Sequence, residues 1–128
     1  MSFSKKNFVS YVNNNAKYTK YIPQHLQRLQ IESFSKKRKI KVIADFLEYN
    51  NMNHLPVLFS LISEKKQKNI IIFSVNSIGI NKKIVKKFMT QISKYRKNIL
   101  FANEGLSNKN NKELKIIKKI TSHKSFLK

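Results

Sequence analysis

The sequence NIIIFSV at Asn69–Val75 decides the fold class of this chain. Its β-branched and aromatic residues form a short, continuous apolar run between polar flanks, which is typical of a buried strand. The run is far shorter than the roughly 18 apolar residues of a membrane span. We therefore expect a buried strand here and no membrane partner.

Strands and helices alternate after this strand. A single glycine marks each of two loops, and apolar residues at helical spacing, such as Ile84, Phe88 and Ile92, mark a helix. The predicted elements are a loop at Asn76–Asn81, a helix from Lys83 to about Tyr95, a strand at Ile99–Ala102, a loop at Asn103–Asn108 and a helix at Lys112–Lys119.

The first half of the chain is less regular. Phe8, Val9 and Val12 recur at helical spacing, so we expect a short amphipathic helix at Lys5–Lys17. Leu55–Ser63 fits either a strand or a helix, and we favour a strand in a hairpin with the strand before it. The other elements are an extended segment at Tyr18–Ile22 that Pro23 closes, a helix at Gln24–Lys37, a strand at Ile40–Leu47, a turn at Asn50–Asn53 and a basic turn at Glu64–Lys68.

These elements predict an α/β (α+β) protein of two small lobes in one compact unit. Residues 1–66 are expected to form an N-terminal lobe with the order helix, strand, helix, strand, strand. Residues 67–128 are expected to form a C-terminal lobe with the order strand, helix, strand, helix, which would carry the nucleic-acid interface. An apolar content of 41% is sufficient to build a core.

The charge of the chain predicts a polyanionic partner. There are 27 Lys and Arg against 6 Asp and Glu, a formal net charge of +21. Repulsion at this density opposes folding and is relieved by counterions or by a phosphate-rich partner. Because Lys greatly outnumbers Arg, we expect neutralisation of backbone phosphates more than reading of bases.

The residues needed for catalysis or for cofactor binding are scarce. The chain has no Cys, and His25, His54 and His123 lie far apart, which fits surface histidines better than a zinc site. We expect Glu48, Glu64 and Glu113, which lie among lysines, to be ion-paired surface groups. No glycine-rich phosphate loop is present. The sequence therefore predicts no catalytic residue, no metal, no cofactor and no small-molecule substrate.

The order of elements and the chain length resemble those of the small ribosomal subunit protein eight family. The family's motifs are short and degenerate in this chain, but they are collinear over nearly its whole length. The opening helix Leu-Thr-x-Ile-Arg-Asn-Ala resembles Val9–Asn15, Gly-Phe-Ile-x-x-Phe resembles the segment around Val42–Phe46, Ile-x-x-Ile-Ser-x-Pro-Gly resembles Ile72–Gly79, and the loop Ser-Thr-Ser-x-Gly-Val-Met-Thr resembles Phe101–Asn108.

This resemblance implies a structural component of a small ribosomal subunit that binds the central domain of the small-subunit rRNA beside neighbouring ribosomal proteins. The chain is rich in Lys, Asn, Ile and Phe, the residues that AT-rich codons encode. This bias favours an organellar and specifically mitochondrial ribosome, with the gene in the organelle. The two glycine loops and the lysines after the first would contact RNA. The predicted RNA-binding residues are Asn76, Ser77, Gly79, Asn81, Lys82, Lys83, Ala102, Asn103, Gly105, Leu106, Ser107 and Asn108.

A second resemblance is to the catalytic domain of resolvase-type serine recombinases. Their strand end Asp-Arg-Leu-x-Arg is similar to Asn76–Ile80, and their Ser-Glu-Gly-Ile-Asp is similar to Asn103–Ser107. Their nucleophile motif Tyr-Ala-Arg-Val-Ser resembles Tyr11–Asn15, which lacks both the Ser and the Arg. This resemblance implies a catalytically inactive DNA-binding protein. We favour the ribosomal interpretation, because it accounts together for the length, the charge and the lack of catalytic groups.

Overall fold

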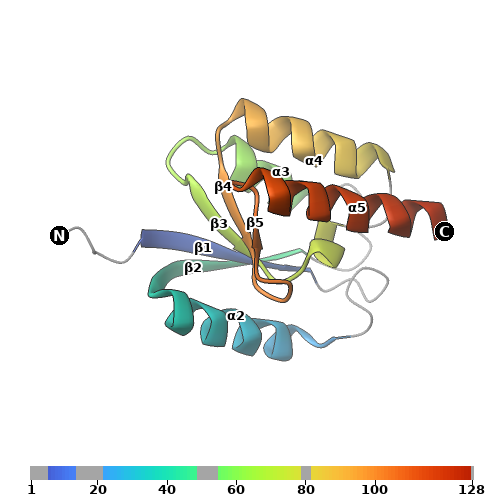
Figure 1. Ribbon diagram of the computed structural model, residues 1–128. Coiled ribbons are helices and arrows are strands. Elements are labelled where there is room, and N and C mark those ends of the chain that lie inside the picture. Colours follow the sequence, from blue (N-terminus) through green and yellow to red (C-terminus); the bar gives the residue numbers. More distant parts are fainter. Residues whose placement is uncertain (1–5, 14–21, 49–54, 79–81, 128) are drawn as a thin grey trace.

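A single five-stranded sheet organises the protein, with helices on both of its faces (Figure 1). The computed structural model describes residues 6–13, 22–48, 55–78 and 82–127. The predicted α/β class is confirmed. The elements are β1 (Lys6–Asn13), α2 (Gln24–Arg38), β2 (Ile40–Glu48), α3 (Pro56–Ser63), β3 (Asn69–Ile72), the 3₁₀ helix η1 (Val75–Ile78), α4 (Lys82–Lys94), β4 (Asn98–Phe101), β5 (Leu106–Ser107) and α5 (Asn111–Leu127).

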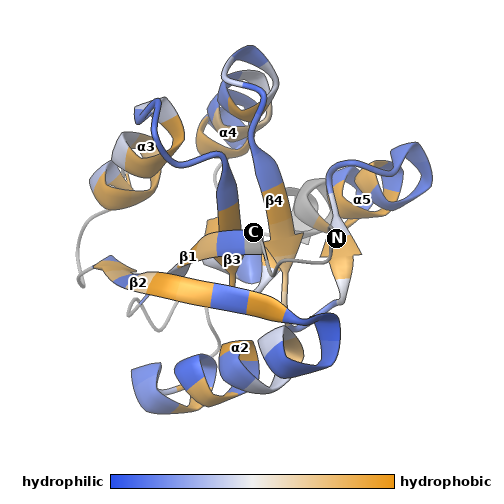
Figure 2. Cartoon of the chain, turned by 90° about the vertical axis from the view of Figure 1, so that its left-hand side faces the viewer, coloured by the Kyte–Doolittle hydropathy of each residue, from blue (hydrophilic) through white to orange (hydrophobic). Residues whose placement is uncertain are grey.

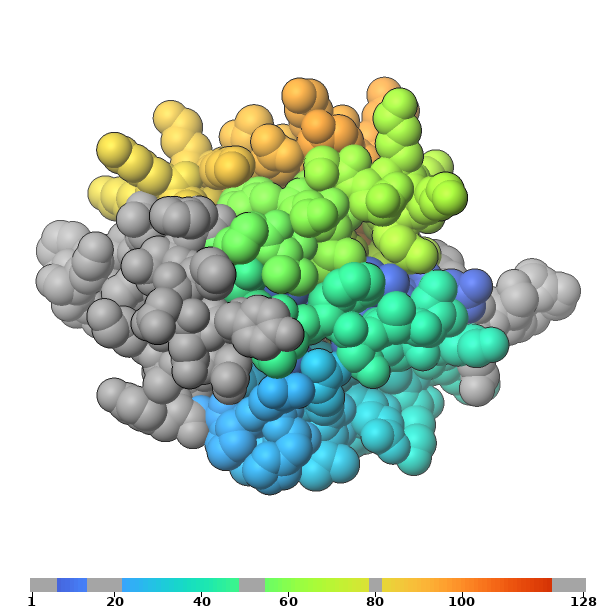
Figure 3. Space-filling view, turned by 180° about the vertical axis from the view of Figure 1, so that it is seen from behind, coloured from blue at the N-terminus to red at the C-terminus, as the bar shows by residue number. Residues whose placement is uncertain are grey.

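The sheet has the order β2-β1-β3-β4-β5, and only β5 runs antiparallel to its neighbour. Parallel neighbours require crossover connections, which the helices provide. Figure 2 shows α2 on one face of the sheet and α3, α4 and α5 on the other, with apolar residues turned toward the strands. Two cores result, one beneath α2 and a larger one beneath the other three helices. Seen from the opposite side in Figure 3, the edge strand β2 lies between α2 and α3.

The predicted helix at Lys5–Lys17 is wrong, because its described part is the strand β1. This strand lies between β2 and β3. Phe8 and Val12 enter the core beneath α2, whereas Val9 and Tyr11 enter the larger core. A parallel strand buried on both faces carries no alternation of apolar and polar residues. The apolar residues of β1 therefore happened to fit helical spacing.

The favoured strand at Leu55–Ser63 is also wrong, because Pro56–Ser63 forms α3. Glu48, at the end of β2, holds the first turn of this helix. Its Oε2 accepts a hydrogen bond from the Val57 N–H at 3.1 Å, and its Oε1 accepts one from the Leu58 N–H at 3.1 Å and one from the Tyr11 hydroxyl at 2.8 Å. A carboxylate is well placed there, since the first N–H groups of a helix have no partner within the helix.

Glu48 is therefore not the ion-paired surface group that the sequence suggested, since its side chain is fully buried. Glu113 also accepts a backbone hydrogen bond, from the Ser107 N–H at 2.8 Å. The division at residues 66 and 67 stays a prediction about sequence segments. Both segments contribute strands to one sheet, because β1 pairs with β3.

We predict that Glu48→Ala destabilises the protein by about 3 kcal/mol, because it removes the acceptor of three donors, two of them buried and one partly buried. Urea unfolding followed by circular dichroism measures the change. Glu32→Ala is the matched control, since Glu32 is exposed and pairs with Lys36 on the surface of α2; it should cost less than about 0.5 kcal/mol. Equal stability of Glu48→Ala and the unmodified protein would contradict this assignment of the cap.

Candidate functional site

The carboxyl ends of the parallel strands β1, β3 and β4 meet at one edge of the sheet, where ligands commonly bind in open α/β folds. Asn13 is the last residue of β1. Ser74 follows β3 after one intervening residue, Asn103 follows β4 after one, and Glu104 comes directly after Asn103. This edge is therefore the first place to look for a site.

Glu104 joins the ends of β3 and β4. Its Oε2 accepts a hydrogen bond from the Ser74 hydroxyl at 2.6 Å, and its Oε1 accepts one from the Val75 N–H at 3.0 Å. The Ser74 hydroxyl in turn accepts a hydrogen bond from the Asn76 N–H at 3.1 Å. Since Ser74 is buried, its hydroxyl serves the turn that follows β3 and does not face a substrate.

Amide side chains fill the neighbouring part of this edge. Asn13 donates from Nδ2 to the Ser77 carbonyl at 3.0 Å. Gln27, on α2, donates from Nε2 to the Asn13 carbonyl at 3.0 Å and to the Ile22 carbonyl at 2.9 Å. Asn13 and Gln27 are fully buried. These bonds tie the end of β1 to η1 and to α2.

The edge therefore holds neutral amides, the Ser74 hydroxyl and one carboxylate that is already engaged. It also holds the Ser77 hydroxyl, which is buried and has no hydrogen-bond partner among the described residues. Phosphoryl transfer requires a nucleophile and cationic groups on the phosphate. Within the described residues, no Lys, Arg or His takes part in these hydrogen bonds. Likewise, no group of three His, Cys, Asp or Glu able to hold a metal occurs in that part of the chain.

The structure separates the predicted RNA-binding residues into several locations. Asn76 and Ser77 lie in η1, with Ser77 fully buried, and Ala102 is also buried. Asn103 and Gly105 lie in the turn after β4, and the chain then returns through Leu106 and Ser107 in β5 to Asn108, whose N–H bonds the Ile99 carbonyl. Asn108 thus lies near the start of β4, away from Asn103. Gly79 and Asn81 lie outside the described residues.

Lys82 and Lys83 open α4, and they belong to a larger basic surface. The sequence of α4 contains no acidic residue, and α5 beside it contains only Glu113. Figure 1 shows the two helices on the same face of the sheet, and Figure 3 shows side chains of α4 projecting outward. We call this the α4/α5 basic surface; its exposed lysines are Lys82, Lys83, Lys86, Lys87, Lys94, Lys112, Lys115, Lys118 and Lys119.

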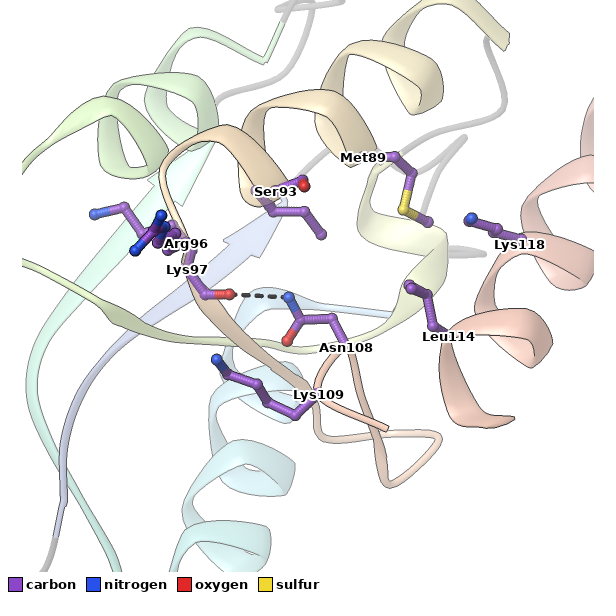
Figure 4. Close-up of a pocket in the computed structure, with 9 residues that line it drawn as sticks. Met89, Ser93, Arg96, Lys97, Asn108, Lys109, Leu114 and Lys118 are labelled. Carbon is purple, nitrogen blue, oxygen red and sulfur yellow. Dashed lines mark hydrogen bonds between the residues drawn. The ribbon is translucent and has the colours of Figure 1, made fainter. Parts of the chain in front are cut away.

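A pocket that no sequence pattern indicates lies between α4, the start of β4 and α5 (Figure 4). Its volume is about 430 Å³. The residues that form it are separated by up to 29 positions in the chain, so only the fold brings them together. They are Met89, Ile92, Ser93, Arg96, Lys97, Asn108, Lys109, Leu114 and Lys118.

Lys97 borders this pocket but turns its ammonium group away from it. Nζ donates hydrogen bonds to the carbonyls of Glu64 and Gln67, and the side chain is almost completely buried. Burial lowers the pKa of Lys97; the Glu64 carboxylate opposes this effect and the Lys68 ammonium adds to it. Through these hydrogen bonds, Lys97 connects the basic turn at Glu64–Lys68 to the turn between α4 and β4.

Two solved structures share this fold. The N-terminal catalytic domain of TP901-1 integrase matches with a TM-score of 0.71 and 8% identity, over 94% of this chain and 95% of that one. A resolvase family site-specific recombinase from Streptococcus pneumoniae matches with a TM-score of 0.68 and 11% identity, over 92% of this chain and 87% of that one. No protein-family model and no curated protein matches the sequence.

The favoured relation to a ribosomal protein is therefore wrong, and the fold is the one that the second resemblance implied. The ribosomal resemblance implies a helix at the start of the chain, whereas the first described element is the strand β1. The roles in rRNA binding and translation that this relation implied are withdrawn with it. No helix in the described part of the chain is long and apolar enough to cross a membrane.

We predict that Gly105→Ala destabilises the protein by roughly 1–2 kcal/mol. Gly105 has a φ of +67°, and apart from Gly105 and its two chain neighbours no atom lies within 4 Å of the position that a Cβ would take, so the cost comes from the backbone and not from a clash. Thermal unfolding measures it. Gly105→Asn should cost less, because Asn adopts this conformation more readily. Equal losses for both variants would point to a different cause.

We predict that Lys97 makes the stability of the protein rise with pH. The lowered pKa means that folded Lys97 loses its proton below the usual value of 10.5, while the unfolded chain still binds it. The free energy of unfolding should therefore increase as the pH rises through this window. Urea unfolding between pH 7 and pH 10 should show this increment in the unmodified protein and in Lys66→Met, but not in Lys97→Met. Parallel curves for all three would contradict it.

Proposed function

We propose that this chain is a catalytically inactive domain of the recombinase fold that binds DNA through the phosphate backbone. The observation that supports this proposal most directly is the α4/α5 basic surface. Its exposed lysines lie on two neighbouring helices that together contain one acidic residue, Glu113. Lysines clustered on one surface with few acidic residues beside them attract a polyanion. The recombinase-like neighbours suggest DNA as that polyanion.

Two features support the absence of catalysis. The residues that resemble the recombinase nucleophile motif end in Asn13-Asn14-Asn15, so neither a Ser nor an Arg occupies those positions. The Asn13 amide, which stands where the motif has its Arg, is buried and hydrogen-bonded to the Ser77 carbonyl. An amide in that position neither attacks a phosphate nor stabilises its charge as a guanidinium does.

The lysines of α4 suit contact with phosphates better than recognition of bases. An ammonium group acts as a strongly hydrated point charge, whereas the bidentate contacts that distinguish bases are typical of Arg. Binding should therefore depend mainly on counterion release and only weakly on the DNA sequence. One of these lysines, Lys87, also lies over the Phe59 ring of α3, with its Nζ 4.3 Å from the ring centroid.

Fluorescence anisotropy with a labelled duplex of random sequence tests this function. If on the order of 6–10 phosphates are neutralised, the affinity should fall by roughly 10³–10⁵ between 50 and 200 mM salt. The double variant Lys82→Gln/Lys86→Gln should weaken binding and reduce the steepness of the salt dependence by about two phosphate contacts.

Lys37→Gln/Lys41→Gln is the matched control, because it removes the same charge from exposed positions on α2 and β2. It should have a much smaller effect than the α4 variant. Equal effects of the two variants would show that net charge, and not the α4/α5 basic surface, governs binding. Cleavage or relaxation of supercoiled plasmid by the purified protein would overturn the inactive assignment, and binding that does not respond to salt would overturn the phosphate mechanism.

A further inference from the structure

The pocket between α4 and α5 has an apolar floor and a cationic rim. Met89 and Ile92 of α4 and Leu114 of α5 supply the apolar part, and none of the described residues that line the pocket is acidic. In Figure 4, Met89 and Ser93 come from α4, whereas Leu114 and Lys118 face them from α5. The rim carries the cations Arg96, Lys109 and Lys118.

The polar groups at the pocket divide into those already used by the fold and those that remain for a ligand. Lys97 donates to carbonyls outside the pocket. The Asn108 amide donates to the Lys97 carbonyl at 2.9 Å and accepts from the Ile99 N–H at 2.9 Å. In the described part of the chain, no acidic side chain pairs with Arg96 or Lys109. The pocket therefore offers uncompensated positive charge beside apolar surface.

We propose that this pocket binds a nucleotide unit, with its base on the apolar floor and its phosphate on Arg96 and Lys109. A bare anion would leave the floor of Met89, Ile92 and Leu114 unused, and a neutral apolar ligand would leave Arg96 and Lys109 without an anionic partner. The volume of about 430 Å³ lies within the range of small-ligand sites. The Met89 sulfur also makes favourable contacts with aromatic rings such as a base.

The nucleotide can be free or part of a DNA strand, and the pocket chemistry is the same for both. If the nucleotide is part of a DNA strand, the inference rests on the proposed function and extends it, because the pocket borders the α4/α5 basic surface through Lys118. A DNA strand whose phosphates contact the lysines of that surface would extend toward the rim of the pocket. The base would then leave its stack and enter the pocket.

Methyl NMR of protein labelled at the methionine methyl groups tests the inference, because Met89 lies in the pocket and is one of only three Met residues in the chain. Met89→Leu assigns its signal. The probes are thymidine 5′-monophosphate, thymidine, inorganic phosphate and a ten-nucleotide oligothymidylate. The monophosphate and the oligonucleotide should both shift the Met89 signal saturably. Thymidine and inorganic phosphate should bind at least about tenfold more weakly, since each lacks half of the interaction.

Ser93→Trp should abolish these shifts by filling the pocket. Thr90→Trp is the matched control, because Thr90 is exposed on the same helix and does not line the pocket. Arg96→Gln/Lys109→Gln should weaken the monophosphate by at least about tenfold and leave the affinity for thymidine unchanged. Tighter binding of the oligonucleotide than of the monophosphate assigns the site to a DNA strand; the reverse order assigns it to a free nucleotide.

An unmoved Met89 signal with both the monophosphate and the oligonucleotide overturns the inference, as does an equal response to inorganic phosphate alone. Duplex binding measured on the same samples separates this failure from a failure of the proposed function. If the duplex still binds with a steep salt dependence, DNA binding stands and only the nucleotide pocket is lost. If the monophosphate binds and the duplex does not, the pocket stands and DNA binding is lost.

Discussion

The position of β1 between β2 and β3 is the constraint on which the rest of the structure depends. A strand paired on both sides and covered on both faces must supply apolar residues in both directions, and Phe8, Val9, Tyr11 and Val12 do so. Its backbone then fixes the neighbouring elements. The Tyr11 carbonyl accepts a hydrogen bond from the Phe73 N–H at 3.2 Å, and the Tyr11 hydroxyl reaches the Glu48 carboxylate that caps α3.

The same strand delivers Asn13 to the edge where an open α/β fold commonly binds its ligands. Here hydrogen bonds within the protein occupy much of that edge, because Gln27 and Ser77 bond to Asn13, and Glu104 bonds to the turn after β3. Two buried polar atoms of the same edge, Gln27 Oε1 and Ser77 Oγ, have no hydrogen-bond partner among the described residues. The groups that carry the two proposals lie elsewhere, on α4, on α5 and in the pocket between them.

The sequence predicts those elements whose signal is local. Gln24–Lys37, Ile40–Leu47 and the helix beginning near Lys83 show clear periodicity, and the structure has them within one or two residues. The run at Asn69–Val75 is a strand only as far as Ile72, because Ser74 and Val75 are drawn into a turn by Glu104, thirty positions away from Ser74. Glu48 shows the same limit: its role as a cap depends on α3 and Tyr11, and nothing in its neighbours along the chain indicates this.

At the candidate site, even fewer features could be predicted from local sequence patterns. The sequence indicated a basic chain with two glycine loops, but not that β5 returns the chain so that Asn108 lies away from Asn103. It also placed the family relation wrongly, since collinear short motifs can be matched to more than one fold when the first element is misassigned. Ser10 and Asp45 illustrate the missing information, because their hydrogen bond joins adjacent strands whose pairing the local patterns did not reveal.

The extreme charge follows in part from how the few acidic residues are used. Of the 6 acidic residues, four accept backbone N–H groups, namely Glu48, Glu64, Glu104 and Glu113. Asp45 accepts a hydrogen bond from Ser10 and pairs with Arg28 at 3.3 Å. Carboxylates employed in this way hold turns and helix ends together and are not placed to neutralise the lysines of α4. A protein that needed only solubility would balance its surface with both signs. Here the acids maintain the fold, while α4 carries no acidic residue and α5 only Glu113, which is the charge separation that the proposed phosphate binding requires.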